Sequence, residues 1–338
     1  MNFNQLTRTW IVAEIGVNHE GSEGIAADLI LKAASAGVDA VKFQTFTPEH
    51  YVSTEQLERF ERVSRFCLSY DAFRRLAKLA NSLNLVFFST PLGLADIDFL
   101  NEIQPIFKIS SGDLTFHELI RHATRTGKPL IISTGLGTEE EIQAAIDVVF
   151  YERPSARTDG SLMLMHCVSA YPTTSEDANL RNIIWLSRRF NLPVGYSDHT
   201  LGIKACELAT AVGAVALEKH FTYRKEDQVF HDHRLSADPT DLKGMVEVVR
   251  EAEKYLGSEV RSRTEAELSM ELHMRRSIGT LIDIPSGVPI ERQWLTWVRP
   301  AWGLAPQEMD MLVGKSLNKF IKAGSLIRHE DIYTDLKI

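Results

Sequence analysis

One pattern repeats along the chain from residue 11 to about residue 256. A short apolar run ends in polar residues, and an amphipathic stretch with helical spacing follows it. Strands that alternate with helices favour parallel pairing, and eight such units in about 250 residues favour a closed (β/α)8 TIM barrel within the α/β class. The apolar runs span residues 11–17, 40–46, 86–91, 106–111, 129–135, 162–168, 193–199 and 214–221.

A doubly wound open sheet is the alternative for alternating strands and helices. It would need a glycine-rich phosphate-binding turn after its first strand. The segment at that position reads GVNHEG (16–21) and lacks this pattern, so the sequence favours the barrel.

The chain changes character after the eighth repeat. We expect the barrel to span residues 1–260 and the charged, helix-prone stretch 261–276 to form a linker. Residues 277–338 contain short β-like runs separated by Gly/Pro turns, which predicts a small, mostly β domain.

Composition excludes several classes of function. The 338 residues carry a net charge of −8, which does not favour nucleic acid or an anionic membrane as a partner. Cys67, Cys167 and Cys206 show no paired spacing, so we expect reduced thiols and a cytoplasmic protein. No apolar signal core begins the chain, and no window approaches the 18 apolar residues of a membrane span.

Every apolar run carries polar residues at its carboxyl end. In a barrel these ends form one rim, where catalytic residues lie. An unpaired buried polar group costs about 1–3 kcal/mol. A contribution to fold stability alone therefore explains poorly why all eight runs end in polar residues. The polar residues of this predicted rim are Glu14, Lys42, Gln44, Thr90, Lys108, Ser111, Ser133, His166, Ser197, Asp198, His199, Glu218 and His220.

Two rim histidines, His199 and His220, follow adjacent runs. Side chains alternate along a strand, so Glu218 and His220 share one face and Lys219 takes the other. Neutral imidazoles are common metal ligands, and a two-histidine site leaves positions open for substrate. Core histidines bonded to backbone or carboxylate groups are an equal alternative from spacing alone.

Two rim lysines, Lys42 and Lys108, lie inside apolar runs. Three roles compete: an anion clamp, a Schiff-base nucleophile, or a structural ion pair with Glu14. Two lysines with several hydroxyls favour the clamp, because a Schiff base needs one lysine.

Two further features have more than one interpretation. Cys167 is interpreted as a small core hydrophobe. The segment HDHRLSADP (231–239) is either a solvated loop or a set of contacts to sugar hydroxyls.

A series of motifs resembles one known family along almost the whole chain. In order they are AEIGVNHEG, AVKFQTF, FFSTP, FKISSGD, GKPLIISTG, HCVSAYPT, VGYSDHT and EKHF. Together they resemble the sialic acid synthases, which include the neuraminate, legionaminate and pseudaminate synthases. The closing segments GVPI, VRPAWGL, IKAGSLI and EDI resemble the antifreeze-like (SAF, β-clip) domain that ends those enzymes.

The resemblance implies an enzyme that condenses phosphoenolpyruvate with an open-chain amino-sugar aldehyde, giving a nonulosonic acid and phosphate by C–O cleavage. It implies a divalent cation on His199 and His220, most commonly Mn²⁺, with Mg²⁺ and Co²⁺ as alternatives. Candidate catalytic carboxylates are Glu14, Glu218 and Asp232. The phosphoenolpyruvate contacts it implies are Lys42, Lys108, Ser111, Ser133 and Ser197.

The same resemblance implies contacts to the sugar and to the partner subunit. Gln44 and Tyr171, with Glu14 and Asp232, match positions around the sugar and the reacting carbons. Thr90, which is one of the hydroxyls of the predicted anion clamp, Ser169 and Asp198 are further substrate-binding candidates. Arg299 matches an arginine that the small domain sends into the other subunit's barrel, which implies a domain-swapped homodimer. Ser169 and the loop around Asp232 depart from the family pattern on the sugar side, so the sugar is left open. A Schiff-base aldolase and a non-catalytic carbohydrate-binding or assembly protein are the alternative functions.

Overall fold

The computed structural model describes residues 1–225 and 232–333. They fall into two compact units, Met1–Gly257 and Ser258–Ile338. None of the helices in these described residues combines the length and the apolar character needed to cross a lipid bilayer.

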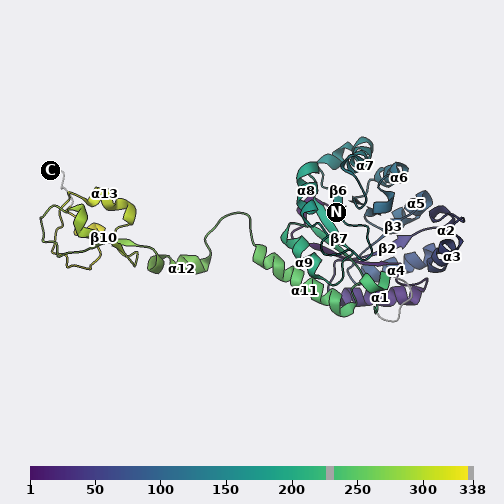
Figure 1. Ribbon diagram of the computed structural model, residues 1–338, viewed down its shortest axis with the longest axis horizontal. Coiled ribbons are helices and arrows are strands. Elements are labelled where there is room, and N and C mark those ends of the chain that lie inside the picture. Colours follow the sequence, from purple (N-terminus) through teal and green to yellow (C-terminus); the bar gives the residue numbers. More distant parts are fainter. Residues whose placement is uncertain (226–231, 334–338) are drawn as a thin grey trace. The chain divides into compact units, whose positions relative to one another are not determined.

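The first unit contains an eight-stranded parallel sheet in the order β3-β2-β1-β8-β7-β6-β5-β4. Its two ends, β3 and β4, contact one another, so the sheet curls into a barrel (Figure 1). This confirms the predicted TIM barrel. The strands are β1 (Trp10–Gly16), β2 (Ala40–Thr45), β3 (Val86–Pro91), β4 (Phe107–Ile109), β5 (Leu130–Ser133), β6 (Leu162–His166), β7 (Val194–Asp198) and β8 (Ala216–His220).

Helices follow the strands and surround the barrel (Figure 1). Side chains at the helix starts accept backbone N–H bonds, as in the capping box between Thr138 and Glu141. The helices are α1 (Glu23–Ala36), α2 (Pro48–Tyr51), α3 (Leu57–Phe66), α4 (Tyr70–Ser82), α5 (Leu94–Ile103), α6 (His117–Arg125), α7 (Glu139–Glu152), α8 (Arg181–Phe190), α9 (Lys204–Ala211), α10 (Asp232–Leu235) and α11 (Pro239–Leu256).

Two apolar layers hold the barrel together. The larger one packs the apolar faces of the helices against the outer face of the sheet, with side chains such as Leu29, Phe73 and Leu217. The smaller one fills the barrel interior with Trp10, Val12, Phe88, Ile131 and Met163, among others.

The inward-facing side chains change along each strand. Because strand side chains alternate, Trp10 and Val12 of β1 point inward together with Glu14. On β8, Ala216 precedes the inward-facing Glu218 and His220. The interior is therefore apolar near the strand starts and polar at the carboxyl ends, which positions the rim residues over an apolar base.

The second unit contains a helix and a small β structure. The helix α12 (Glu265–Met274) lies within the stretch expected to be a linker, and a capping box of Thr264 and Glu267 begins it. Strands β9 (Ser277–Thr280) and β10 (Leu295–Val298) pair antiparallel. The short helix α13 (Met309–Leu312) follows, and the apolar core comprises Ile278, Ile284, Ile290, Leu295, Leu304, Met309, Leu312, Leu317, Ile321 and Ile327.

Candidate functional site

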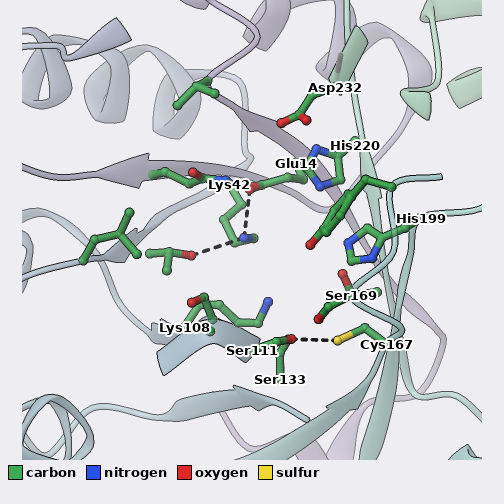
Figure 2. Close-up of a pocket in the computed structure, with 18 of the residues that line it drawn as sticks. Glu14, Lys42, Lys108, Ser111, Ser133, Cys167, Ser169, His199, His220 and Asp232 are labelled. Carbon is green, nitrogen blue, oxygen red and sulfur yellow. Dashed lines mark hydrogen bonds and ion pairs between the residues drawn. The ribbon is translucent and has the colours of Figure 1, made fainter. Parts of the chain in front are cut away.

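A cavity of about 490 Å³ opens at the carboxyl ends of the barrel strands (Figure 2). Most of the site residues expected from the sequence line this one space. They are Glu14, Lys42, Gln44, Thr90, Lys108, Ser111, Ser133, Ser169, Tyr171, Ser197, His199, Glu218, His220 and Asp232. His231 of the expected sugar loop lies outside the described residues.

Two predicted positions differ from this arrangement. Asp198 faces the outer side of β7, where its carboxylate binds Lys219, so the prediction that it contacts substrate is wrong for this structure. His166 also faces outward, and its Nε2 lies 2.8 Å from the Ala178 carbonyl oxygen. Both follow from strand alternation, because their neighbours Ser197 and Met165 point inward. Arg299 belongs to the second unit.

A network of buried charges forms the floor of the cavity. The Lys108 ammonium donates to both Glu218 oxygens at 3.2 and 3.1 Å, and Ser197 Oγ donates to Glu218 at 2.9 Å. Lys42 Nζ lies 3.1 Å from Glu14 Oε1 and 3.5 Å from Glu218 Oε1. The β1–β2 register places Glu14 directly opposite Lys42. Each lysine is thus paired with a carboxylate.

The network sets the protonation of its members. Burial raises the pKa of Glu218, but Lys108 and Lys42 outweigh it and lower the pKa to about 2. Burial also lowers the Lys42 pKa, but Glu14 and Glu218 outweigh it and leave the pKa raised. For Lys108 burial prevails and its pKa is lowered, with repulsion from Lys42 adding to the effect. Glu218 is therefore a permanent anion at neutral pH.

The two carboxylate oxygens of Glu14 differ in their hydrogen bonding among the described residues. Gln44 Nε2 donates to Glu14 Oε1 at 3.1 Å, while Oε2 is buried without a hydrogen-bond partner among residues 1–225 and 232–333. Gly16 makes this arrangement possible. Its φ of +55° suits glycine, and an added Cβ would lie 3.2 Å from Glu14 Oε1 and 3.3 Å from Gln44 Nε2.

His199 and His220 face one another across the ends of β7 and β8, with ring centroids 5.4 Å apart (Figure 2). His199 Nδ1 lies 2.7 Å from the Val168 carbonyl oxygen, so Nδ1 carries the proton and Nε2 a lone pair. His220 Nδ1 is buried without a partner among the described residues. Burial lowers the pKa of both imidazoles, so both are neutral at neutral pH.

These two rings suit a divalent cation. Both are neutral, one is oriented by a backbone carbonyl as metal-binding histidines are, and one has an unsatisfied buried nitrogen. Tyr171 covers the His199 ring at a centroid distance of 4.3 Å. Within the described part of the chain, no group of three or more His, Cys, Asp or Glu residues has metal-site spacing, so a bound cation would keep open positions.

Small polar side chains surround Gly135 in the cavity wall. Ser111 Oγ lies 2.9 Å from Cys167 Sγ. A Cβ added at Gly135 would lie 2.5 to 2.9 Å from the side chains of Ser169, Cys167 and Ser111, so glycine leaves this space open. Cys167 is buried, as expected of a core hydrophobe, and it also lines the cavity.

The helix α3 contributes lining residues that the sequence reasoning missed. Arg59, Arg62, Val63 and Phe66 lie at i, i+3, i+4 and i+7, so they share one helix face, and all four line the cavity. The signal was present in LERFERVSRF, but it needs the barrel to show which face meets the cavity. Tyr51 and Leu136 complete this part of the rim.

Comparison with known proteins identifies the family. The model described as the NeuB family matches residues 29–261. The chain belongs to the NeuB family. It is 38% identical to the N,N'-diacetyllegionaminic acid synthase of Legionella pneumophila over 96% of this chain and 94% of that protein. It is 33% identical to a pseudaminic acid synthase of Campylobacter jejuni over 98% of both chains.

A solved structure agrees with these relatives. The N-acetylneuraminic acid synthetase of Leptospira borgpetersenii superposes with a TM-score of 0.73 at 32% identity, covering 78% of this chain and 90% of that one. The chain is thus an enzyme of the sialic acid synthase type.

Proposed function

We propose that the chain condenses phosphoenolpyruvate with an open-chain amino-sugar aldehyde in a metal-dependent reaction, giving a nonulosonic acid and phosphate. The observation that supports this most is that one cavity contains two groups of residues with different binding properties. A floor with two lysines and several hydroxyls lies beside a pair of neutral histidines. The first element suits a small polyanion and the second a cation.

Phosphoenolpyruvate would bind on the floor. Its phosphate and carboxylate would accept charge-assisted hydrogen bonds from Lys42 and Lys108, which now bind Glu14 and Glu218. The hydroxyls of Ser111, Ser133 and Ser197 would complete the contacts. A fixed orientation of the enol carbon toward the aldehyde lowers the entropic part of the barrier.

His199 and His220 would hold the divalent cation, for which Mn²⁺ is the first candidate. When bound there, such a cation supplies a Lewis acid for the aldehyde oxygen. Tyr171 and Ser169 lie on the same side and would contact the sugar.

The reaction balances with one water. C3 of phosphoenolpyruvate forms a bond to the aldehyde carbon, whose oxygen takes a proton and becomes a hydroxyl. Water adds to the electron-poor C2, and the C2–O bond to phosphate then breaks. The products are a 2-keto-3-deoxy acid and inorganic phosphate.

The three candidate carboxylates differ in what they can do. A group with a pKa of about 2 is a poor proton carrier at neutral pH, so Glu218 would instead hold both lysines and stabilise positive charge at C2. Proton transfer then falls to Glu14, whose buried Oε2 has no hydrogen-bond partner among the described residues, and to Asp232, which points into the cavity near His220 (Figure 2).

We also propose that the second unit is an antifreeze-like domain that brings Arg299 to the barrel of a partner subunit in a domain-swapped homodimer, and that the enzyme acts in the cytoplasm. Mixed dimers test this. An Arg299→Ala chain paired with a catalytically inactive His220→Ala chain should regain sugar affinity at one site. A fully active monomer would refute the swapped arrangement.

The reaction is tested by phosphate release from phosphoenolpyruvate with Mn²⁺. The acceptors are N-acetylmannosamine, mannose and 2,4-diacetamido hexoses, each with and without chelator. We expect chelator-sensitive release with one sugar class, abolished in His199→Ala and His220→Ala. Release that persists without metal would refute the ligand assignment, and borohydride trapping of a keto acid on Lys42 or Lys108 would favour the Schiff-base alternative.

A further inference from the structure

The helix α3 places two arginines at the mouth of the cavity. Arg59 and Arg62 line the cavity and are exposed, whereas Lys42 and Lys108 on the floor are only 4% and 2% exposed. The two pairs of cations therefore lie at different depths. The mouth pair has no role in the reaction proposed above.

The arginine-bearing helix is anchored against the barrel. Val63 and Phe66 of the same face pack against the apolar cluster of Val17, Phe46 and Leu92. The apolar residues fix the helix, and the arginines one turn away are held over the cavity.

These arginines lack anionic partners within the described residues. In residues 1–225 and 232–333, Arg59 donates only to the neutral Gln56 amide, at 3.3 Å, and Arg62 forms no ion pair. Glu58 lies four residues before Arg62, a spacing that suits an ion pair, yet none forms. Elsewhere on the barrel Arg74 binds Glu102, Arg75 binds Glu23 and Arg189 binds Glu139. Among the described residues, no carboxylate is therefore paired with the two arginines at the mouth.

The depth of the two cation pairs indicates what the mouth would bind. On the proposed function, on which this inference rests, the aldehyde end of the acceptor must reach phosphoenolpyruvate on the floor. The opposite end of an extended acceptor then lies at the mouth beside α3. The floor lysines are already opposed by Glu14 and Glu218, so the surplus charge is at the mouth.

We propose that Arg59 and Arg62 select an acceptor sugar that carries an anionic group at the end farthest from its aldehyde. Planar guanidinium groups bind phosphate esters and carboxylates through paired N–H donors, so either group fits. Val63, Phe66 and Tyr51 would contact the apolar parts of the acceptor between the floor and the anion.

Matched sugars test the proposal. N-acetylmannosamine and mannose are compared with their 6-phosphates, and mannose also with mannuronate, by calorimetric titration and by kcat/KM for phosphate release. We expect at least one anionic sugar to bind about tenfold or more tighter than its neutral counterpart, a size consistent with charge-assisted contacts at a partly exposed site. The 6-phosphates and mannuronate together show whether the arginines prefer a phosphate ester or a carboxylate.

The arginines are then replaced by shorter, neutral side chains that keep hydrogen-bonding capacity. In Arg59→Gln/Arg62→Gln the ratio of anionic to neutral affinity should fall to near one. Arg65→Gln is the matched control, because Arg65 lies on the same helix but does not line the cavity, and it should keep the ratio. Raising the salt from about 0.05 M to about 0.5 M should weaken the wild-type preference, because screening acts on exposed charges.

The outcomes separate this inference from the proposed reaction. If no sugar releases phosphate, the reaction proposal fails, while the binding ratios still decide the role of the arginines. If a neutral sugar releases phosphate and every anionic analogue binds no tighter than its neutral counterpart, the reaction stands and the arginine proposal is overturned. A ratio unchanged in the double variant overturns it as well.

Discussion

Strand β8 carries two buried ion-pair networks on its opposite faces. The inner face presents Glu218 to Lys42 and Lys108 inside the barrel. The outer face presents Lys219 to Asp198 of β7, at 2.8 Å. Glu218 and Lys219 are neighbours in sequence, and both are almost fully buried. Both networks pair a lysine with a carboxylate, so they differ mainly in what surrounds each ion pair.

The outer network is complete. Asp198 accepts bonds from Tyr196 Oη at 3.1 Å, from the Thr200 backbone N–H at 2.9 Å and from Cys206 Sγ at 3.4 Å, besides Lys219. Lys219 also donates to the Thr200 carbonyl oxygen. These bonds join β7 to β8 just before His199 and beside His220, so the outer network positions the histidine pair.

The inner network is incomplete and faces a cavity. Glu14 retains a buried oxygen without a partner among the described residues, and Lys42 donates to the Thr90 hydroxyl, which lines the cavity. A buried polar group left partly unsatisfied costs free energy and is typical of a site that binds a ligand. The comparison suggests that the outer network serves stability and the inner one serves binding.

The largest expected effect comes from Lys219→Met. It leaves the Asp198 carboxylate buried without its cation, and breaking one side of a buried pair costs about 3–5 kcal/mol. Urea unfolding of the full chain measures the loss. The matched change on the inner face is Lys108→Met, which should cost clearly less, because Glu218 keeps Ser197 and Lys42 as partners. Equal losses in the two variants would remove the distinction between the networks.

A double variant sharpens the same comparison. Asp198→Leu/Lys219→Met removes both charges, so we expect it to recover about 2–3 kcal/mol relative to the sum of the single changes. Recovery should be incomplete, because Tyr196 and the Thr200 N–H lose their acceptor. Strict additivity of the single losses would show that Asp198 and Lys219 do not stabilise each other.

The inner network was largely predictable and the outer one was not. Strand alternation and the run AVALEKHF placed Glu218 and His220 on the inner face and Lys219 on the other, as observed. The same rule, applied to GYSDHT, puts Asp198 on the opposite face from Ser197, but its place among the other polar residues of the rim predicted a contact with substrate. The partners of Lys219 come from another strand, and pairing between strands depends on a register that one sequence does not display.

The α3 arginines show a second limit. Their shared helix face is visible in the sequence, but a face has meaning only once its neighbours are known. Glu58 and Glu61 beside them favour a solvated helix with internal ion pairs, which is the ordinary expectation for alternating charges. The fold supplies the missing fact, because it places that face over the cavity.

A third prediction concerns ligand binding. Lys108→Ala should weaken phosphoenolpyruvate binding by about 2 kcal/mol, roughly 30-fold, because it removes one charged donor from the proposed clamp. Calorimetric titration with phosphoenolpyruvate alone measures this without turnover. Lys32→Ala is the control, since Lys32 pairs with Asp28 on the exposed face of α1. Unchanged affinity in Lys108→Ala would contradict the clamp.

The smallest expected effect is a pH dependence that the inner network should impose. The folded pKa of Glu218 is about 2, whereas its ordinary value is 4.5, so the unfolded chain binds a proton more readily. The stability that Glu218 contributes is therefore fully present above about pH 4.5 and is lost as the pH falls toward 2. Glu218→Gln lacks this titration. The difference in unfolding free energy between wild type and Glu218→Gln should shrink from pH 5.5 to pH 3.

The slope of that difference has an upper limit. One proton contributes at most about 1.4 kcal/mol per pH unit, and Glu218 should approach this limit only below pH 4.5. His199 and His220 also destabilise the fold in acid, because their pKa values are lowered in the folded protein. Both histidines are present in wild type and in Glu218→Gln. Where the substitution leaves their pKa values unchanged, their contributions to the unfolding free energy cancel in the difference. A difference that stays constant with pH would mean that Lys42 and Lys108 do not lower the pKa of Glu218 in the folded protein. Glu218 would still be ionised at neutral pH, but its ion pairs on the floor of the cavity would add no net stability to the fold.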